Sequence, residues 1–214
     1  MRRKKVVLQS TCNFMRTGLE TFIRDTDLSV SLDIVESTDS LEKCEGILNS
    51  LMNVNLIVLT FNNHDYNLTS LLQLVGEYLP KTHPNSKVIL IGDIAKVNSL
   101  KYYFSRLSNV SAILDKTIAI DELRKELLGI NTNKAQKLER TSPLLSMREL
   151  QVLQMLLDGD TATKIADNLQ LNFRTVSHHK RAALAKLGVR SLCPLVSLRS
   201  KDKHSNRIPH LMRA

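Results

Sequence analysis

The first two-thirds of the chain alternates short apolar runs with segments in which apolar residues recur at helical spacing. The runs LIVLT and VILIG are nearly continuous, which is typical of strands buried on both faces of a parallel sheet. Five successive strand–helix units predict an α/β domain with a doubly wound, five-stranded parallel sheet over residues 1–128. The predicted strands are Lys5–Leu8, Ser31–Val35, Leu56–Thr60, Val88–Gly92 and Ser111–Leu114, and the predicted helices are Phe14–Arg24, Ser40–Leu51, Thr69–Tyr78, Val97–Leu107 and Ile120–Leu128.

The pattern changes beyond residue 128. Residues 129–142 (GINTNKAQKLERTS) are polar and precede Pro143, which predicts a linker. Residues 143–199 show only helical spacing and predict an all-α domain of four helices, followed by a basic tail at 200–214. Ser146 and Glu149 have the spacing of a capping box before the first of these helices. The second and third helices, at about 161–169 and 173–187, are joined by a tight turn, as in a helix-turn-helix unit.

The excess positive charge lies in this second part of the chain. Residues 1–133 carry 15 Lys+Arg and 15 Asp+Glu, whereas residues 134–214 carry 15 Lys+Arg and 6 Asp+Glu, which accounts for the whole net charge of +9. This asymmetry favours a polyanionic partner, with a solvated basic surface as the alternative. The helix at 173–187 bears directly on these two interpretations, because one of its faces carries Arg174, Ser177, His178 and Arg181. It is either an ordinary amphipathic surface helix or one that reads a polyanion.

Other features narrow the functional class. Cys12, Cys44 and Cys193 match no CxxC spacing, so we expect inert thiols in a reducing compartment rather than disulfides or a zinc site. The apolar run after MRRKK is too short for a signal peptide, and no run has the length of a membrane span. We therefore expect a soluble, cytoplasmic protein without a membrane partner. No Gly-rich phosphate loop, GxSxG or HExxH motif occurs, so an enzyme is the least favoured class and we expect no cofactor.

Residues 145–189 (LSMRELQVLQMLLDGDTATKIADNLQLNFRTVSHHKRAALAKLGV) resemble the helix-turn-helix domain of LuxR/NarL-type bacterial transcription regulators. The resemblance runs without a gap. It implies a sequence-specific transcription regulator whose partner is double-stranded DNA. The matching positions are Glu149, Leu153, Gly159, Ile165, Ala166, Leu169, Thr175, Val176, His179, Lys186, Leu187 and Gly188.

The resemblance and the geometry of a helix together assign roles in DNA binding. In such a unit the second helix enters the major groove, where side chains on its exposed face reach base edges. We expect base contacts from Ser177, His178 and Arg181. Flanking residues suit phosphate contacts, although for each a solvated helix face is the alternative. These residues are Lys164, Asn172, Arg174, Thr175, Lys180 and Lys186.

Two other groups in this domain have competing interpretations. The pair His178-His179 does not predict a metal site, because adjacent side chains on a helix point about 100° apart. Leu192, Leu195 and Val196 lie in the fourth helix, which forms a dimer face in relatives. The equal alternative is that they close the small core of the domain.

Members of this family often begin with a receiver domain, and FMRTGLETFI resembles the first receiver helix. A receiver needs an acidic pair after its first strand to hold Mg²⁺ and an aspartate at the end of its third strand to accept a phosphoryl group. Here Gln9-Ser10-Thr11 follow the first strand and Thr60 occupies the acceptor position, while Lys116 stands where the receiver lysine is expected. Residues 53–63 contain no Asp or Glu. The resemblance therefore implies a degenerate receiver without a magnesium site or an aspartyl nucleophile.

A receiver that is not switched still presents a dimerisation surface. The absence of the receiver carboxylates and the SHHKR stretch resemble features of auxiliary regulators related to the Rcs phosphorelay group. These regulators pair with a separate phosphorylatable regulator. This implies a homodimer or a heterodimer with another response regulator, and it leaves control by a small ligand open. The alternative is a protein-interaction module that titrates another regulator without binding DNA. The basic face of the helix at 173–187 argues against that alternative.

Overall fold

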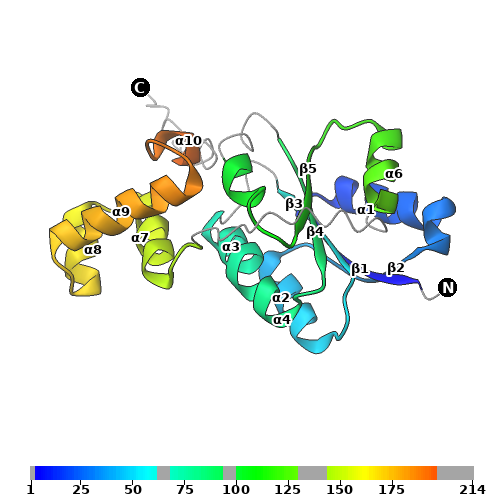
Figure 1. Cartoon of the computed structure of the whole chain (residues 1–214), viewed down its shortest axis with the longest axis horizontal. Helices are drawn as coiled ribbons and strands as arrows, with labels where there is room; N and C mark the ends of the chain where they lie inside the picture. The colour runs from blue at the N-terminus through cyan, green and yellow to red at the C-terminus, as the bar shows by residue number, and fades with distance from the viewer. Residues whose placement is uncertain (1–2, 62–67, 94–99, 130–143, 197–214) are drawn as a thin grey trace, which may run out of the picture.

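The computed structural model describes residues 3–61, 68–93, 100–129 and 144–196, the side chain of Val196 excepted. A five-stranded parallel sheet in the order β2-β1-β3-β4-β5 is followed by a helical domain (Figure 1). The predicted fold class, with its doubly wound parallel sheet, is confirmed. The strands are β1 (Lys4–Gln9), β2 (Leu32–Thr38), β3 (Leu56–Phe61), β4 (Lys87–Gly92) and β5 (Val110–Asp115).

Helices cover both faces of the sheet, which explains the continuous apolar runs. All six residues of β3 are buried. Val6 and Leu8 pack towards α1 (Asn13–Arg24) and α6 (Ile120–Gly129), whereas Val7 packs on the opposite face. That second face is covered by α2 (Leu41–Ser50), α3 (Leu68–Gln73) and α4 (Leu79–Thr82) (Figure 1).

The helix predicted at Thr69–Tyr78 contains a π-helical turn, η2 (Leu74–Tyr78), between α3 and α4. The amide of Leu79 donates to the carbonyl of Leu74, and Pro80 has no N–H to offer to the next carbonyl. The carbonyl of Val75 instead accepts a hydrogen bond of 2.9 Å from the buried side chain of Asn109. A residue 34 positions away therefore completes this helix.

The helical domain comprises α7 (Met147–Leu157), α8 (Ala162–Leu169), α9 (Phe173–Leu187) and α10 (Cys193–Val196). Both hydrogen bonds of the predicted capping box at Ser146 are present. Gly188 has φ +73°, a left-handed conformation that glycine adopts without strain, and ends α9. The predicted linker lies outside the described residues apart from Gly129, which ends α6, and the tail at 200–214 lies outside them entirely.

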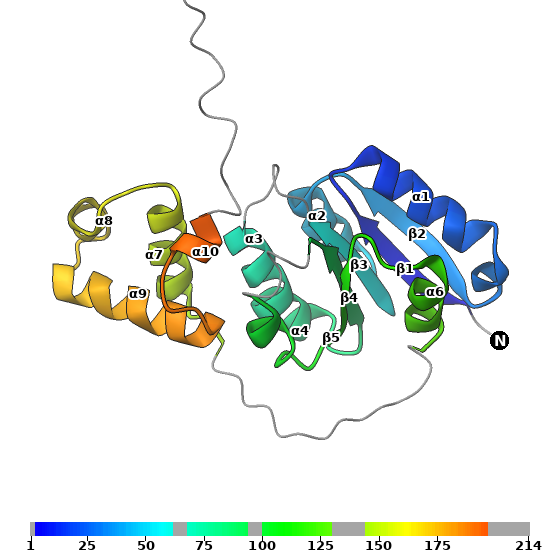
Figure 2. The ribbon, with the colours of Figure 1, turned by 90° about the horizontal axis from the view of Figure 1, so that it is seen from above.

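The helical domain contacts the α/β domain mainly through α7 and α3. The hydroxyl of Thr69 hydrogen-bonds to the side-chain oxygen of Gln154, and one apolar cluster includes residues of both domains, such as Leu71 and Leu153. Consequently α7 lies beside α3, whereas α8 and the start of α9 point away from the sheet (Figures 1 and 2). The outer face of α9 is therefore left uncovered by the α/β domain.

The three cysteines are free. Cys44 is buried against the sheet, and burial raises the pKa of its thiol to about 12. A thiol with this pKa stays protonated near neutral pH and is a poor nucleophile. Cys193, at the start of α10, is exposed.

Candidate nucleic-acid interface

The helix pair α8–α9 is built by local hydrogen bonds and a small apolar core. Thr161 caps α8 by accepting from the amide of Lys164, and Asn172 caps α9 by accepting from the amide of Arg174 at 2.8 Å. Gln170, with φ +53°, turns the chain between the two helices. Val152, Ile165, Ala166 and Val176 form the core beneath them. This core fixes the inner face of α9 and so determines which side chains face outwards.

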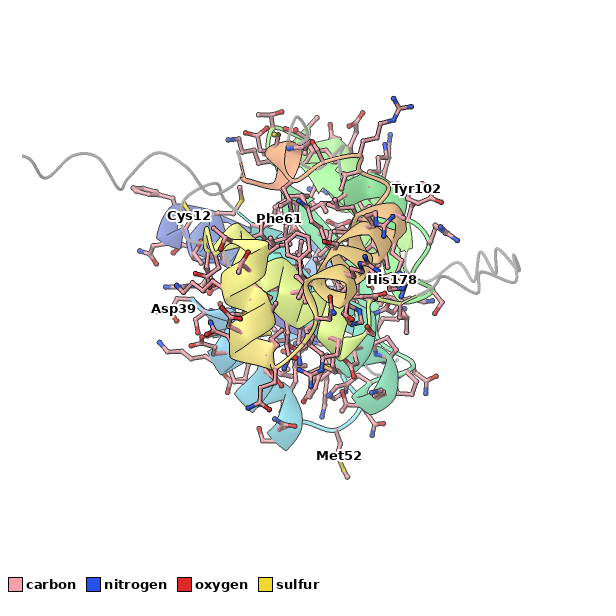
Figure 3. The ribbon with its side chains drawn as sticks, turned by 90° about the vertical axis from the view of Figure 1, so that its left-hand side faces the viewer. Cys12, Asp39, Met52, Phe61, Tyr102 and His178 are labelled. Atoms are coloured by element: carbon pink, nitrogen blue, oxygen red, sulfur yellow. The ribbon has the colours of Figure 1, made fainter. Side chains whose placement is uncertain are left out.

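The three predicted base-contacting residues share the outer face of α9. His178 and Arg181 are exposed and Ser177 is half-buried. The Nε of Arg181 donates to the carbonyl of Ser177 at 3.3 Å, so the guanidinium folds back along its own helix. Figure 3 views the molecule from the side of the helical domain and shows His178 on α9. The rings of His178 and His179 are 6.0 Å apart between centroids, and the described residues contain no group of three or more potential metal ligands.

The predicted phosphate-contacting residues around this face differ in their exposure and in the contacts that their side chains make. Arg174 is exposed, and Thr175 and Lys180 are half-buried at the margin of the face. Lys164 is exposed and forms an ion pair of 2.6 Å with Asp160. The side chain of Asn172 is used as the cap of α9. An exposed ion pair contributes little to stability, so Lys164 can exchange Asp160 for another anion at little cost.

Lys186 has a different environment from the other basic residues of α9. Its ammonium lies 2.7 Å from a carboxylate oxygen of Glu149 and donates to the carbonyl of Leu144 at 2.8 Å. Burial by itself raises the pKa of Glu149, but hydrogen bonds from Lys186 and Ser146 outweigh it and hold that pKa below its ordinary value of 4.5. Lys186 thus ties the end of α9 to the start of α7, instead of standing free at the predicted phosphate-contacting position.

We expect Glu149→Gln to lower the free energy of unfolding at pH 7 by about 1–3 kcal/mol, because it replaces a charged hydrogen bond while glutamine can still serve in the capping box. Since the pKa of Glu149 is lowered in the folded state, its contribution is full above pH 4.5 and is lost as pH falls through the folded-state pKa. Urea unfolding at pH 7 and pH 3.5 should show the difference between wild type and variant shrinking at the lower pH. Glu122→Gln, on the exposed side of α6, serves as the control and should have little effect.

The leucines in and just before α10 face inwards where they are described. Leu195 is 1% exposed and belongs to the apolar cluster that includes Ala183, Leu184 and Leu187. Leu192 packs against the same cluster, and the side chain of Val196 lies outside the described residues. For Leu195 the structure therefore favours closure of the core over an open dimer face.

Neutral side chains occupy the position at which a receiver would carry its acceptor aspartate. Thr60, at the acceptor position, is 2% exposed, and its hydroxyl donates to the hydroxyl of Ser10 at 2.6 Å. Ser10 in turn donates to the carbonyl of Cys12 at 3.1 Å. Lys116 lies 3.5 Å from Asp93, the carboxylate that follows β4. The position of the missing aspartate is thus closed by two hydrogen-bonded hydroxyls.

Comparison with known proteins shows that the helical domain matches a family model. Residues 143–198 match the family model of bacterial regulatory proteins of the luxR family. The Fimbriae Z protein of Escherichia coli K12 is 39% identical over 67 residues, which cover 31% of this chain and 32% of that protein. The transcriptional regulatory protein RcsA of Escherichia coli O157:H7 is 23% identical over 177 residues, covering 81% of this chain and 82% of RcsA.

The two-domain fold also has solved counterparts. RcsB of Salmonella enterica serovar Typhimurium, bound to promoter rprA, aligns with a TM-score of 0.56 and 18% identity over 94% of this chain and all of that chain. A structure of two RcsB dimers bound to two parallel DNAs aligns with a TM-score of 0.53 and 19% identity over 92% and 98% of the two chains. In the part of the chain that the structure describes, every helix is too short or too polar to span a membrane. Residues 143–198 therefore match the luxR family of bacterial regulatory proteins, and the chain as a whole is similar in sequence to RcsA and in its two-domain fold to RcsB.

Proposed function

We propose that this DNA-binding LuxR-family regulator reads sequence with α9 in the major groove. Ser177, His178 and Arg181 face the base edges. One observation carries this proposal: the outer face of α9 is uncovered, and the helix contains four basic and no acidic side chains. An arginine on such a face can pair with guanine through two hydrogen bonds. The relatives that match are regulatory proteins, which agrees with a binding role rather than an enzymatic one.

Side chains at the margin of the outer face of α9 make the phosphate contacts that position the domain on DNA. Lys164, Arg174 and Lys180 contact phosphates, supported by Asn172 and Thr175 at the start of the helix. We assign Lys186 a structural role instead, because its ammonium already contacts Glu149 and Leu144. Phosphate contacts of this kind add affinity without sequence information.

Lys180→Ala should weaken binding to specific and unrelated duplexes by a similar factor and reduce the slope of log affinity against log salt by about 1. Titrations of both duplexes at three or more salt concentrations would measure this. A loss restricted to the specific duplex would instead move Lys180 into the base-reading group.

The receiver-like domain, residues 1–128, is not switched by aspartyl phosphorylation and serves dimerisation or partner binding. The hydrogen-bonded pair of Thr60 and Ser10 supports the first part, since neither side chain is an acyl-phosphate acceptor. The likeness in fold to the RcsB dimers on DNA supports the second. The working form is a homodimer or a heterodimer with another response regulator, acting in the cytoplasm.

Genome-wide crosslinking of the intact protein in its own cells, with sequencing of the enriched DNA, tests this function. A symmetric inverted repeat indicates a homodimer that reads both half-sites. An asymmetric motif that disappears when another regulator is deleted indicates a heterodimer. The absence of any enriched motif would contradict the proposal and favour an interaction module that titrates another regulator.

A further inference from the structure

The two domains meet at the helical turn of residues 100–104 as well as at α3 and α7. A Cβ placed on Gly188 would lie 2.5 Å from Cδ1 of Tyr102, so the tyrosine ring rests against the backbone of this glycine. Gly188 ends α9, the helix proposed to read DNA. The end of α9 therefore lies beside the α/β domain, whereas its start points away from the sheet (Figures 1 and 2).

The neighbouring Tyr103 makes a second contact between the domains. Its side chain is 2% exposed, and a Cβ placed on Gly76 would lie 2.6 Å from its hydroxyl oxygen, so the tyrosine fits only because Gly76 has no side chain. Burial raises the pKa of Tyr103, while a hydrogen bond from the backbone of Leu145 acts in the opposite direction. Tyr103 thus reaches from the α/β domain to the segment that leads into α7.

A third contact joins α3 to the middle of α7. The hydroxyl of Thr69 hydrogen-bonds to the side-chain oxygen of Gln154, and Leu71 and Leu153, each 1% exposed, belong to one apolar cluster. Domains of one chain are expected to move relative to each other unless their interface is large and apolar. Here the contacts lie at the start of α7, in its middle and at the end of a different helix, α9. Because these three points do not share one line, they fix the orientation of the helical domain.

Tyr102 is held in place from within its own domain. Nη1 of Arg106 donates to the Tyr102 hydroxyl at 2.6 Å, and the guanidinium carbon lies 4.9 Å from the centre of the ring. Tyr102 is 51% exposed, so it contributes little to the core of the α/β domain. Its ring acts as a support for the end of α9 instead.

We propose that Tyr102 is a positioning residue for DNA reading. Together with the contacts of α3 and Tyr103, its ring against Gly188 fixes the direction of α9 relative to the α/β domain. This inference rests on the proposed function, in which the receiver-like domain serves dimerisation, because the paired α/β domains then set the separation of the two reading helices. A rigid link raises the effective concentration of the second α9 at a half-site of matching distance and lowers it at other distances. The protein therefore selects the spacing of half-sites as well as their bases.

NMR relaxation of backbone amides in the full chain tests the rigid link without DNA. Amides of the α/β domain and of the helical domain should report one shared rotational correlation time. In Tyr102→Ala combined with Gln154→Ala, which removes the contact at α9 and the hydrogen bond at α7, the helical domain should tumble faster than the α/β domain. The matched control combines Tyr102→Phe with Gln154→Ala. Because it keeps the ring, it should retain the shared time.

Three results of this measurement would count against the proposal. Two separate correlation times in the wild-type protein would exclude a rigid link. One shared time in the variant that carries Tyr102→Ala would show that the apolar cluster alone holds the domains together. Loss of the amide signals of a folded α/β domain in that variant would make Tyr102 a structural residue, although its exposure predicts that the domain stays folded.

Binding to duplexes of different spacing then tests the consequence for DNA reading. The enriched duplex is compared with one in which about 5 base pairs, half a helical turn, are added between the half-sites. The wild-type protein and the Tyr102→Phe control should lose at least ~10-fold in affinity on the longer duplex, whereas the Tyr102→Ala variant should lose less than ~3-fold. Equal losses in all three proteins would contradict positioning by Tyr102. Failure of the proposed function is distinguishable, because the protein would then bind neither duplex while its domains still shared one correlation time.

Discussion

Replacing Arg181 with alanine should reduce binding to the specific duplex by roughly 5- to 150-fold, which corresponds to about 1–3 kcal/mol, and should relax the preference at the base pair that it contacts. The physical reason is the loss of a bidentate pair with a base edge. Arg181 is exposed on the outer face of α9 and is held along the helix only by its contact with the Ser177 carbonyl, so it can extend towards a groove. Binding to unrelated duplexes should fall much less.

Fluorescence anisotropy with the enriched motif and with a scrambled duplex, at one fixed salt concentration, would measure both effects. Arg24→Ala is a matched control, because it removes the same charge from an exposed position on α1 of the receiver-like domain. It should change neither affinity nor preference appreciably. Unchanged affinity and unchanged preference in Arg181→Ala would exclude this arginine from base reading.

Incubation of the protein with acetyl phosphate and Mg²⁺ should give no acyl-phosphate adduct, whereas a receiver domain that retains its aspartate, treated in parallel, should be modified. Two deficits act together. Gln9 at the end of β1, with Ser10 and Thr11 after it, provides no carboxylate to hold Mg²⁺, and Thr60 at the acceptor position is buried and hydrogen-bonded to Ser10. Restoring the carboxylates that hold Mg²⁺ would not supply an acceptor aspartate, and restoring the aspartate would not supply the Mg²⁺ ligands.

Intact-mass measurement of the treated protein provides the readout, since a phosphoryl adduct adds a defined mass and is removed by hydroxylamine. A substantial adduct of this kind would overturn the proposal that the receiver-like domain is unswitched. Peptide mapping would then show whether Asp93, the carboxylate beside Lys116, had replaced the missing acceptor.

The local sequence pattern was sufficient to predict many of the structural features of this protein. The continuous run in β3 predicted a doubly covered strand, and the capping residues around α7 and α9 predicted where these helices begin. These features depend on hydrogen bonds and periodicities within a few residues, which a sequence displays directly. The outward position of Arg181 followed for the same reason, because one helical face was already occupied by apolar residues.

Contacts between distant residues were decided by the tertiary structure. The sequence predicted a phosphate contact for Lys186 and gave no indication that its ammonium also contacts Glu149, a residue 37 positions away. It left Leu195 with two interpretations until packing buried it, and it gave no sign of the π-helical turn that Asn109 completes. The contact of Tyr102 with the end of α9 likewise becomes visible only when the two domains are packed together. The amino-acid sequence by itself thus determined the secondary-structure elements, the helix-turn-helix pattern and the absence of the receiver carboxylates. Three-dimensional packing decided which polar and apolar side chains remain available to a partner.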